Sequence, residues 1–518
     1  MSLLSKLKDL QPWEHLASHR FENGDKVKLL ALGVIVLLVI KVVVQAIYNT
    51  FFHPLAAVPG PSLAKIFESY LVPAQAGLHR AQTLRSLHDK YGSVVRVGTN
   101  EVSVSDWTAY RLIYGQKTSS KRPLFYEATK LAGHDNVFTF ISKQAHSARR
   151  KLQNPAYSLQ AVLNNESFIA EKADILIKRM INASDGSKVT EATADVFKYN
   201  GLFSLEVILK CAYNRNYGES PEGEALKLLR NMDSSAVGIQ IQAALPWLSR
   251  SIAKYLPGIA GTSFQSWDVW QEMTTALVEK FQHEELAADT IRQKFMITPM
   301  IVNEDSFLGR KITQEELIEE MMALTFAGSG TTSSTLTYLM YSLARDTKTQ
   351  ERLREELYES GESFNELKDL PILNAVIKET MRLYPTIIST LPRVLDQSVV
   401  VDKVVLPKGT VAGMQNYVHH RDAKLFPSPD EFLPDRWLKD GEHVKDMNNA
   451  ITPFSLGPRN CIGQNLARAE LYLATSKVFR KLRLTLHESM TEWDMEMEDR
   501  FNIAPKGRRC LLNVETLG

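Results

Sequence analysis

The sequence predicts a mainly α-helical protein with a small β region and one N-terminal transmembrane helix. Three observations predict it: an apolar run from Leu29 to Tyr48, a long helical pattern from Gln314 to Arg345, and a β-hairpin pattern from Tyr91 to Asp106. The chain has 518 residues, 44% hydrophobic and 23% charged, which is ordinary for a globular protein with a large core. Internal repeats and low-complexity linkers are absent from the sequence, so one folded domain is expected after the apolar run.

The apolar run is long enough to cross a membrane. Twenty helical residues span about 30 Å, the thickness of the hydrocarbon core, and only Lys41 and Gln45 interrupt the run. A cleaved signal peptide is the alternative, but no small-residue cleavage site follows, and Pro54 and later prolines stop the helix. The predicted segments are an N-terminal segment 1–28, a membrane anchor 29–48, a proline-rich hinge 49–62 and one domain at 63–518.

Charge and cysteine content exclude two classes of protein. The net charge of +2 creates no general attraction for nucleic acid, and no basic run interleaved with aromatic residues occurs, so we expect no nucleic-acid partner. Cys211, Cys461 and Cys510 are the three cysteines. This odd and sparse count argues against a disulfide framework and favours a reducing compartment, where a functional cysteine is a ligand or a nucleophile.

The long helical pattern contains an unusual middle. Thr313 and Glu316 form a capping box, and the following 32 residues, Gln314–Arg345, give a helix of about 48 Å. From Phe326 the chain reads Phe-Ala-Gly-Ser-Gly-Thr-Thr-Ser-Ser, and these are poor helix formers. Two explanations stay open: a ligand that lies against the bare backbone, or a seam of small residues where helices pack.

One segment near the C-terminus carries the strongest chemical signal. It reads Phe454-Ser-Leu-Gly-Pro-Arg-Asn-Cys-Ile-Gly and precedes a helical pattern. The sulfur of Cys461 can therefore receive backbone N–H groups and the positive end of a helix, and both stabilise a thiolate. Gly457 and Gly463 allow a tight backbone path and the close approach of a flat cofactor. Arg459 suits a carboxylate partner.

This segment matches the pattern FxxGxRxCxG and resembles the haem-binding signature of the cytochrome P-450 family, the haem-thiolate monooxygenases. The resemblance implies the cytochrome P-450 fold, haem as cofactor and Cys461 as the proximal iron ligand, whose thiolate favours cleavage of the O–O bond. It also implies that four neighbouring residues bind haem, namely Phe454, Gly457, Arg459 and Gly463.

Two further motifs match the family. Glu379-Thr-Met-Arg382 fits its ExxR element and is followed by Leu-Tyr-Pro, whereas the similar Glu351–Arg354 segment lacks that continuation. Phe432–Trp437 fits the element whose arginine, here Arg436, joins the ExxR pair. The resemblance implies an ion network of Glu379, Arg382 and Arg436 that supports the cysteine loop and takes no part in catalysis.

The long helix resembles the oxygen-activating segment of the family. Thr331 falls where the family places the hydroxyl that helps to deliver protons to iron-bound O2, so it is the predicted catalytic residue. The family usually has Asp or Glu just before this threonine, and here the residue is Gly330. A carboxylate relay is therefore absent at that position, and we hypothesise that ordered water, Ser329 or Thr332 replaces it.

Three residues are predicted partners of the haem propionates. The family pattern WxxxR places both of its residues on a propionate; Arg150 matches the arginine, and His146 stands in place of the tryptophan. His146 can still donate one hydrogen bond, and a histidine on a helix surface is the alternative. The resemblance adds Arg393 as a further partner.

The motifs follow the family order over nearly the whole chain, and the FHPL…VPGP hinge resembles membrane-bound members from filamentous fungi. Such members take electrons from NADPH-cytochrome reductase, which implies a single-pass anchor in the endoplasmic reticulum membrane and a cytosolic catalytic domain. Three basic residues shortly precede the apolar run and only Lys65 closely follows it, which alone predicts the opposite orientation. In that orientation the sequons at Asn165 and Asn182 would be glycosylated.

The first functional hypothesis is a monooxygenase that uses O2 and reductase-supplied electrons to hydroxylate or epoxidise a hydrophobic small molecule, such as a fungal secondary-metabolite intermediate. The second is a reductase-independent haem-thiolate isomerase or dehydratase, and the third is a haem-based sensor or carrier. Three largely apolar segments are expected to border the pocket and its membrane entrance, namely Pro123–Phe140, Ile239–Leu256 and Ile387–Ile388.

Overall fold

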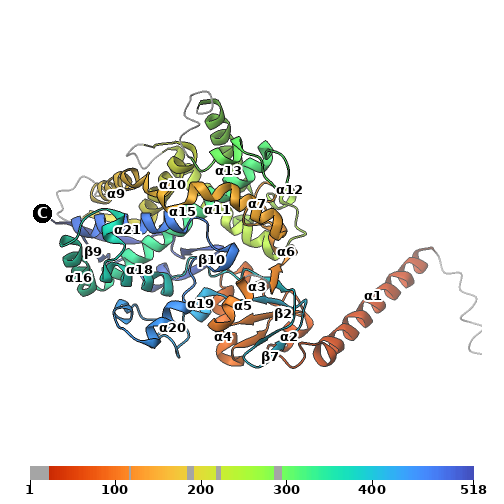
Figure 1. Cartoon of the computed structure of the whole chain (residues 1–518). Coiled ribbons are helices and arrows are strands. Elements are labelled where there is room, and N and C mark those ends of the chain that lie inside the picture. Colours follow the sequence, from red (N-terminus) through yellow and green to blue (C-terminus); the bar gives the residue numbers. More distant parts are fainter. Residues whose placement is uncertain (1–22, 116–117, 184–191, 218–222, 285–294, 518) are drawn as a thin grey trace, which may run out of the picture.

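The computed structural model describes residues 23–115, 118–183, 192–217, 223–284 and 295–517. Helices make up most of the domain, and a strand-rich part lies beside the N-terminal helix α1 (Figure 1). The prediction of a mainly helical domain with a small β region is therefore confirmed. The central helix α15 is surrounded by long helices, and the principal ones are α9 Glu166–Ile181, α10 Val196–Tyr213, α11 Glu224–Ala244, α13 Gly258–Glu284, α18 Pro371–Leu383 and α21 Gln464–Lys481.

The central helix α15 runs from Gln314 to Arg345, as the sequence predicts. The hydroxyl of Thr313 accepts a hydrogen bond from the Glu316 N–H at 3.3 Å, and the Glu316 carboxylate accepts one from the Thr313 N–H at 2.7 Å. This reciprocal cap satisfies N–H groups that lack a partner inside the helix. Most side chains of its C-terminal half are buried, so the helix is the axis of the hydrophobic core.

The small residues in the middle of α15 are explained in part by packing. A Cβ on Gly328 would lie 2.8 Å from the side chain of Ile208 on α10, and a Cβ on Gly330 would lie 2.0 Å from the amide nitrogen of Asn502. Both glycines therefore allow other elements to touch the helix backbone. The hydroxyl of Thr331 donates to the carbonyl of Ala327, and other hydroxyls of this stretch likewise bond to carbonyls of the preceding turn.

The strands of the described residues form four small sheets. β1 Val94–Arg96 and β2 Glu101–Val104 pair antiparallel, which confirms the predicted hairpin. They belong to a five-stranded sheet of order β1-β2-β8-β5-β3. A separate hairpin of β10 and β11 has Phe501 at its tip. The other strands are β3 Ser119–Lys121, β4 Ala192–Asp195, β5 Arg393–Leu395, β6 Val399–Val401, β7 Val404–Leu406, β8 Val411–Gly413, β9 Leu482–Leu486, β10 Met497–Arg500, β11 Asn502–Pro505 and β12 Leu511–Thr516.

Shorter helices connect these elements and cover the sheets. They are α2 Ser62–Ile66, α3 Val72–Ala76, α4 Arg80–Tyr91, α5 Tyr110–Tyr114, α6 Pro123–Ala128, α7 Lys143–Gln153, α8 Leu159–Leu163, α12 Arg250–Ala253, α14 Thr298–Val302, α16 Thr347–Tyr358, α17 Phe364–Leu367, α19 Asn416–His419, α20 Glu442–Ala450 and α22 Glu492–Met495.

The N-terminal helix projects from the strand-rich side of the domain (Figure 1). α1 spans Asn23–Ile47 and continues as a π-helical turn over Tyr48–Phe52, so the helix runs four residues beyond the predicted end at Tyr48. The stretch Val27–Phe52 is the one described helix that is long and apolar enough to cross a membrane, and its side chains are not buried in the domain. Residues 1–22 of the predicted N-terminal segment lie outside the described residues.

A single arginine joins the end of the anchor helix to the first sheet. Arg96 on β1 is completely buried and donates hydrogen bonds to the carbonyls of Asn49 at 2.7 Å and Thr99 at 2.6 Å. A third donor bond reaches the carbonyl of Leu55 at 3.3 Å. Because the last carbonyls of a helix have no partner within it, Arg96 completes the end of the anchor helix from the folded domain.

Candidate active site

Cys461 lies on a short loop directly before α21. Its N–H donates to the carbonyl of Phe454 at 2.8 Å, which fixes the loop, and its side chain is exposed to a cavity. Gly457 has a φ of +72°, and a Cβ there would lie 2.3 Å from the carbonyl oxygen of Gly115, so only glycine fits. Burial raises the pKa of the Cys461 thiol, whereas a hydrogen bond from the Gly463 backbone and the charge of Arg150 lower it.

The cavity above Cys461 lies between the cysteine loop and the central helix and has a volume of about 260 Å³. Phe454 and Gly463 line it on the side of Cys461, and Ala327 and Thr331 of α15 line it on the opposite side. Of the two hydroxyls suggested to replace a carboxylate relay, Thr332 also lines this cavity. Ser329 does not, because it points from another face of α15 into a separate cavity. The candidates that could replace the missing carboxylate relay are therefore Thr332 and ordered water.

A second cavity, of about 430 Å³, shares several lining residues with the first and is strongly basic. Among the described residues, five lysines and arginines line it and no aspartate or glutamate does. The predicted partners of the propionates meet here, namely His146, Arg150, Arg393 and Arg459. Arg150 donates to the backbone and side-chain oxygens of Asn460, and Arg459 donates to the carbonyl of Phe140 at 2.7 Å. His146 is buried, so the alternative of a surface histidine is wrong.

Sequence reasoning missed two basic residues of this cavity, Lys143 and Lys121. Lys143 is exposed, so the more informative of the two is Lys121. It lies at the end of β3, is buried, and its ammonium group donates to the carbonyl of Phe138. No local sequence motif identifies Lys121 as part of the site. It comes to lie beside Arg393 only because strand β3 pairs with strand β5, far along the chain.

The electrostatics of the basic cavity predict an anionic occupant. Burial lowers the pKa of Lys121 far below its usual value, and the charges of Arg459 and Arg393 lower it further. Burial and the same surrounding cations lower the pKa of His146 to about 3. Since buried positive charge is unfavourable without a counter-charge, a ligand with acidic groups is needed here. A flat cofactor with two carboxylates at one edge and a thiolate-binding metal at its centre fits this arrangement, and haem is such a cofactor.

Two adjacent acidic residues on α15 hold the loop that closes the cavity. The Glu319 carboxylate is fully buried and accepts hydrogen bonds from the backbone N–H groups of Leu131, Ala132 and His134 and from the side chain of Asn136. Four donors on one carboxylate leave the loop little freedom. Its position is therefore set by α15.

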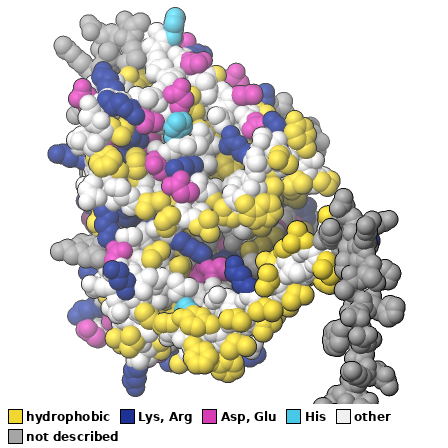
Figure 2. Space-filling view, turned by 90° about the vertical axis from the view of Figure 1, so that its right-hand side faces the viewer, with side chains coloured by type: hydrophobic (Ala, Val, Ile, Leu, Met, Phe, Trp, Pro, Cys, Tyr) yellow, Lys and Arg dark blue, Asp and Glu magenta, His cyan; other side chains and the backbone are white. Residues whose placement is uncertain are grey.

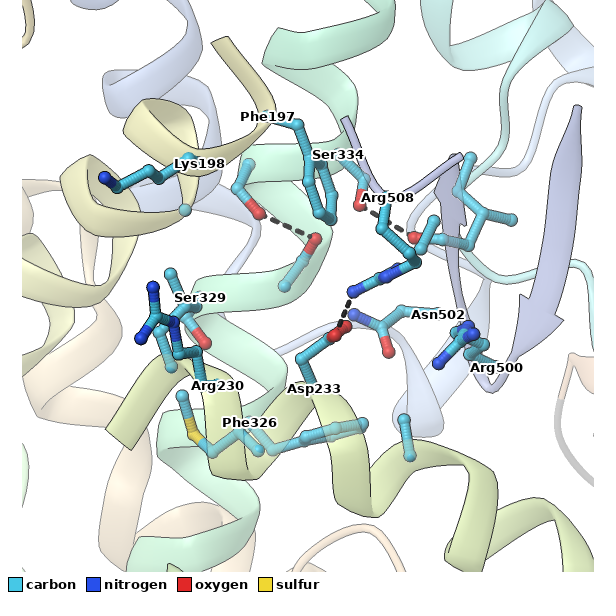
Figure 3. A pocket seen from close by; sticks show the side chains of 18 of the residues that line it. Phe197, Lys198, Arg230, Asp233, Phe326, Ser329, Ser334, Arg500, Asn502 and Arg508 are labelled. Carbon is cyan, nitrogen blue, oxygen red and sulfur yellow. Dashed lines mark hydrogen bonds and ion pairs between the residues drawn. The ribbon is translucent and has the colours of Figure 1, made fainter. Parts of the chain in front are cut away.

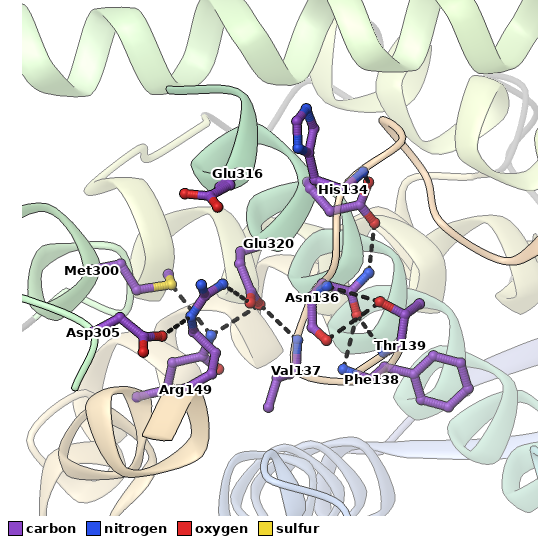
Figure 4. Close-up of polar contacts among 12 residues, drawn as sticks. His134, Asn136, Val137, Phe138, Thr139, Arg149, Met300, Asp305, Glu316 and Glu320 are labelled. Atoms are coloured by element: carbon purple, nitrogen blue, oxygen red, sulfur yellow. Dashed lines mark hydrogen bonds and ion pairs between the residues drawn. The ribbon is translucent and has the colours of Figure 1, made fainter. Parts of the chain in front are cut away.

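Glu320 extends this contact to the next residues (Figure 4). Its carboxylate accepts from the N–H of Val137 at 3.2 Å and from the guanidinium of Arg149 at 2.5 Å. Arg149 also donates to Asp305 at 2.8 Å. Burial raises the pKa of Glu320, and the charge of Arg149 opposes this effect. Val137 and Phe138 line the cavity, so both glutamates position its wall.

The other walls agree in part with the segments predicted to border the substrate. Ile387 lines the cavity, whereas its neighbour Ile388 is fully buried in the core. The ring of Phe138 makes an edge contact with Phe501 at a centroid distance of 5.5 Å. Leu124 and Trp247 line a further opening of the domain. The predicted pocket segments therefore divide between the cavity, the core and an outer opening.

The predicted ion network is confirmed. The Glu379 carboxylate accepts two hydrogen bonds from Arg382, at 2.8 and 2.9 Å, and one from Arg436 at 3.1 Å. Trp437 donates to the same carboxylate at 2.9 Å. In the similar segment, Arg354 also forms an ion pair with Glu351, but the Glu351 side chain is 44% exposed. This pair is separate from the hydrogen bonds of the Glu379 carboxylate.

Comparison with known proteins gives one family. A family model described as Cytochrome P-450 matches residues 58–512. The cytochrome P-450 monooxygenase TRI4 of Fusarium sporotrichioides is 30% identical over 466 residues, covering 87% of this chain and 88% of the relative. The cytochrome P-450 monooxygenase oblB of Emericella variicolor is 31% identical over 464 residues, covering 84% and 83%.

The fold gives the same result. The solved structure of the cyanobacterial CYP120A1 with retinoic acid bound has a TM-score of 0.71 and 19% identity, and covers 89% of this chain and 99% of its own. That likeness concerns the fold alone. The family model matches most of the chain, and the fold is that of this family. Both findings agree with the cysteine loop and the basic cavity described above. The chain belongs to the cytochrome P-450 family, and it is an oxidoreductase, a monooxygenase whose cofactor is haem with iron bound by a cysteine thiolate.

Proposed function

We propose that this chain oxidises a hydrophobic small molecule with O2 and two electrons from NADPH-cytochrome reductase, with Cys461 as the iron ligand. The observation that carries the proposal is the cavity with the Cys461 sulfur on one side and Thr331 on the other. Bound haem supplies the activation of O2, so that one oxygen atom enters the substrate and the other leaves as water with two protons.

The residues of the chain have separate tasks in this proposal. Lys121, Arg150, Arg393 and Arg459 neutralise the two haem carboxylates, because they are among the basic side chains of a cavity that no described acidic residue lines. The Gly463 backbone and Arg150 stabilise the Cys461 thiolate, because both lower the pKa of this thiol against the effect of burial. The hydroxyl of Thr331 holds a proton on the opposite side, where its bond to the Ala327 carbonyl orients it.

The walls support a hydrophobic substrate. The cavity is lined by several hydrophobic side chains, which include Val137, Phe138, Leu324 and Ile387. Apolar and aromatic walls with few polar groups bind ligands of the same character. A terpenoid, polyketide or alkaloid intermediate of fungal secondary metabolism fits this description, and the fungal monooxygenases among the relatives support that class.

We also propose an endoplasmic reticulum anchor with a cytosolic domain. The helix over Val27–Phe52 supports the anchor. Hydrophobic side chains gather on the face of the domain beside this helix and around a hollow that holds charged groups (Figure 2). Large exposed hydrophobic side chains include Phe52 at the end of this helix and Leu124 and Trp247 at the outer opening. Lipid contact with such residues would place the opening at the membrane surface.

The first test is the carbon monoxide difference spectrum of the reduced protein in microsomes. The wild type should show the strongly red-shifted Soret band of thiolate-ligated haem, and Cys461→Ala should lose it. Cys211→Ala is the matched control, since Cys211 is buried on α10 and does not line the cavity, and it should keep the band. A wild-type protein that folds but binds no haem, or an unchanged band in Cys461→Ala, would refute the assignment.

The second test separates the monooxygenase from a reductase-independent isomerase or dehydratase. Product formation should require NADPH, reductase and O2, and one oxygen atom from labelled O2 should appear in the product. Conversion that continues without reductase would favour the alternative reaction.

A further inference from the structure

A separate cavity of about 270 Å³ lies on the other side of the central helix. Phe326, Ser329, Gly330 and Ser333 of α15 line it, whereas Ala327 and Thr331 line the cavity above Cys461. These two sets lie on different faces because successive helical residues are about 100° apart. The remaining walls come from the start of α10, from α11 and from the β10–β11 hairpin (Figure 3).

One part of this cavity is apolar. Phe197, Leu229, Met232 and Phe326 contribute hydrophobic side chains from three helices. The ring of Phe197 also receives the guanidinium of Arg508 at 4.7 Å from its centroid. This part can bury the body of an organic molecule, because apolar area removed from water is the main source of affinity.

The charges of the other part are unbalanced. Four basic side chains line the cavity, namely Lys198, Arg230, Arg500 and Arg508, against two acidic ones, Asp195 and Asp233. Arg508 pairs with Asp233, and Arg500 pairs with Glu498 at 2.8 Å. Arg230 is exposed and, within the described part of the chain, contacts no acidic side chain. The cavity therefore keeps an excess of positive charge.

One buried hydrogen-bond donor of this cavity has no acceptor among the described residues, and a second donor projects beside it. The Nη1 atom of Arg508 is buried without a partner. The side-chain amide of Asn502 lies against the backbone at Gly330 and projects beside Arg508 (Figure 3). Unpaired buried donors are unfavourable, so a ligand that accepts hydrogen bonds would relieve them.

We propose that this cavity is a second binding site, for an amphipathic organic anion with an apolar body and a carboxylate or sulfonate group. The apolar body lies against Phe197, Leu229 and Phe326, and the anionic group receives bonds from Arg230, Arg508 and Asn502. The site is distinct from the haem cavity, since the backbone of α15 at Gly328 and Gly330 is in tight contact with α10 and with Asn502.

The test uses 8-anilinonaphthalene-1-sulfonate, a fluorescent aromatic sulfonate, and N-phenyl-1-naphthylamine, which has the same body without the charge. The full-length haem-loaded protein in phosphatidylcholine nanodiscs is titrated, with empty nanodiscs subtracted. The sulfonate should bind roughly tenfold more tightly than the neutral probe, because charge-assisted hydrogen bonds are stronger than neutral ones. Saturating the haem with an iron-ligating azole should leave the sulfonate Kd within about twofold, as expected for independent sites.

Two charge reversals on one helix provide the matched comparison. Arg230→Glu should raise the Kd of the sulfonate by about tenfold or more, since attraction becomes repulsion at the ligand. Lys227→Glu makes the same charge change on α11 at an exposed position that does not line the cavity, and it should have little effect. Ala236→Trp fills the cavity and should abolish binding of both probes.

The carbon monoxide spectrum verifies that each variant is folded and loaded with haem. Displacement of the sulfonate by the azole would overturn the proposal, because it would place the probe in the haem cavity. Equal Kd values for Arg230→Glu and Lys227→Glu would also overturn it, since the effect would then come from overall charge.

Discussion

At the scale of single residues, the role proposed for the Thr331 hydroxyl predicts how tightly NADPH oxidation is coupled to product formation. Thr331→Ala should raise the fraction of NADPH oxidised without product, because the alanine cannot hold a proton in the cavity. Thr331→Ser keeps the hydroxyl and should stay close to the wild type. The ratio of product to NADPH consumed measures the effect, and an unchanged ratio in Thr331→Ala would exclude this role.

The next prediction concerns the four hydrogen bonds that Glu319 receives from the loop. Glu319→Gln places a donor amide among donor N–H groups, so the loop should loosen. Hydrogen exchange measured by mass spectrometry should become at least about tenfold faster in peptides that contain Leu131 and Ala132. Glu315→Gln, an exposed change on the same helix, is the control. Exchange that is equally slow in both variants would contradict the assignment.

Residues within compact motifs could be predicted from the sequence, and residues joined only by tertiary contacts could not. Cys461, Thr331 and Arg150 each belong to a local pattern whose spacing carries their chemistry. Glu319 acts on residues more than 180 positions earlier in the chain, and no local pattern records that contact. Lys121 is similar, because its role depends on the charges that the fold places around it.

At the scale of elements, the hairpin of β10 and β11 occupies the place that a carboxylate at position 330 would need. A Cβ on Gly330 would lie 2.0 Å from the Asn502 amide, so Gly330→Asp should displace the hairpin and lower the thermal midpoint. Asn502→Gly removes that amide, and the double variant should recover much of the loss. Additive effects of the two changes would contradict direct contact between the positions.

Asp499, near the tip of the same hairpin, predicts a pH dependence. Burial raises the pKa of Asp499 to about 6, although bonds from Ser389 and Phe501 and the charge of Arg80 lower it. Its Oδ2 atom has no partner among the described residues, which agrees with a protonated oxygen. Because this pKa lies above that of an unfolded aspartate, the native state holds the extra proton. Its stabilising effect is therefore present at low pH and is lost as the pH rises through about 6.

Asp499→Asn removes this titration while it keeps the shape of the side chain. The difference in thermal midpoint, wild type minus variant, should fall as the pH rises from about 5 to 7 and then become constant. A difference that stays flat across this range would show that Asp499 does not titrate there.

Element boundaries were predictable where the end signal is local. The capping box predicted where α15 begins, and the observed bounds, Gln314–Arg345, match those predicted from the sequence. The anchor helix was expected to end at Tyr48, yet it continues to Phe52. The physical reason is that Pro54 restricts only the residue before it, and His53 indeed adopts an extended conformation.

At the scale of the whole molecule, the orientation of the domain decides which compartment the sequons meet. With the proposed cytosolic domain, Asn165 and Asn182 stay unmodified, and endoglycosidase treatment of the microsomal protein should leave its mass unchanged. A sequon introduced upstream of the anchor is the positive control. A mass loss that disappears in Asn165→Gln would reverse the orientation.

The fold as a whole was predictable from the order of the motifs. The presence of separate cavities on two faces of α15, one above Cys461 and one beside Asn502, was not predictable. Both cavities depend on which side chains of α15 face which neighbour, and the helical period alone does not identify those neighbours. The contact of Gly330 with Asn502 joins positions more than 170 residues apart, so it emerged only from the folded chain.

The bond between Arg96 and the carbonyl of Asn49 has a mechanical consequence. A domain joined to its membrane helix by a flexible linker would reorient freely, so that different faces of the domain would contact the bilayer. Here the last turn of the anchor is bonded to the first sheet, so bending at that point requires the loss of buried hydrogen bonds. With α1 as the proposed membrane anchor, we expect the domain to keep one orientation relative to the bilayer plane, so that tilting of α1 would tilt the whole domain with it.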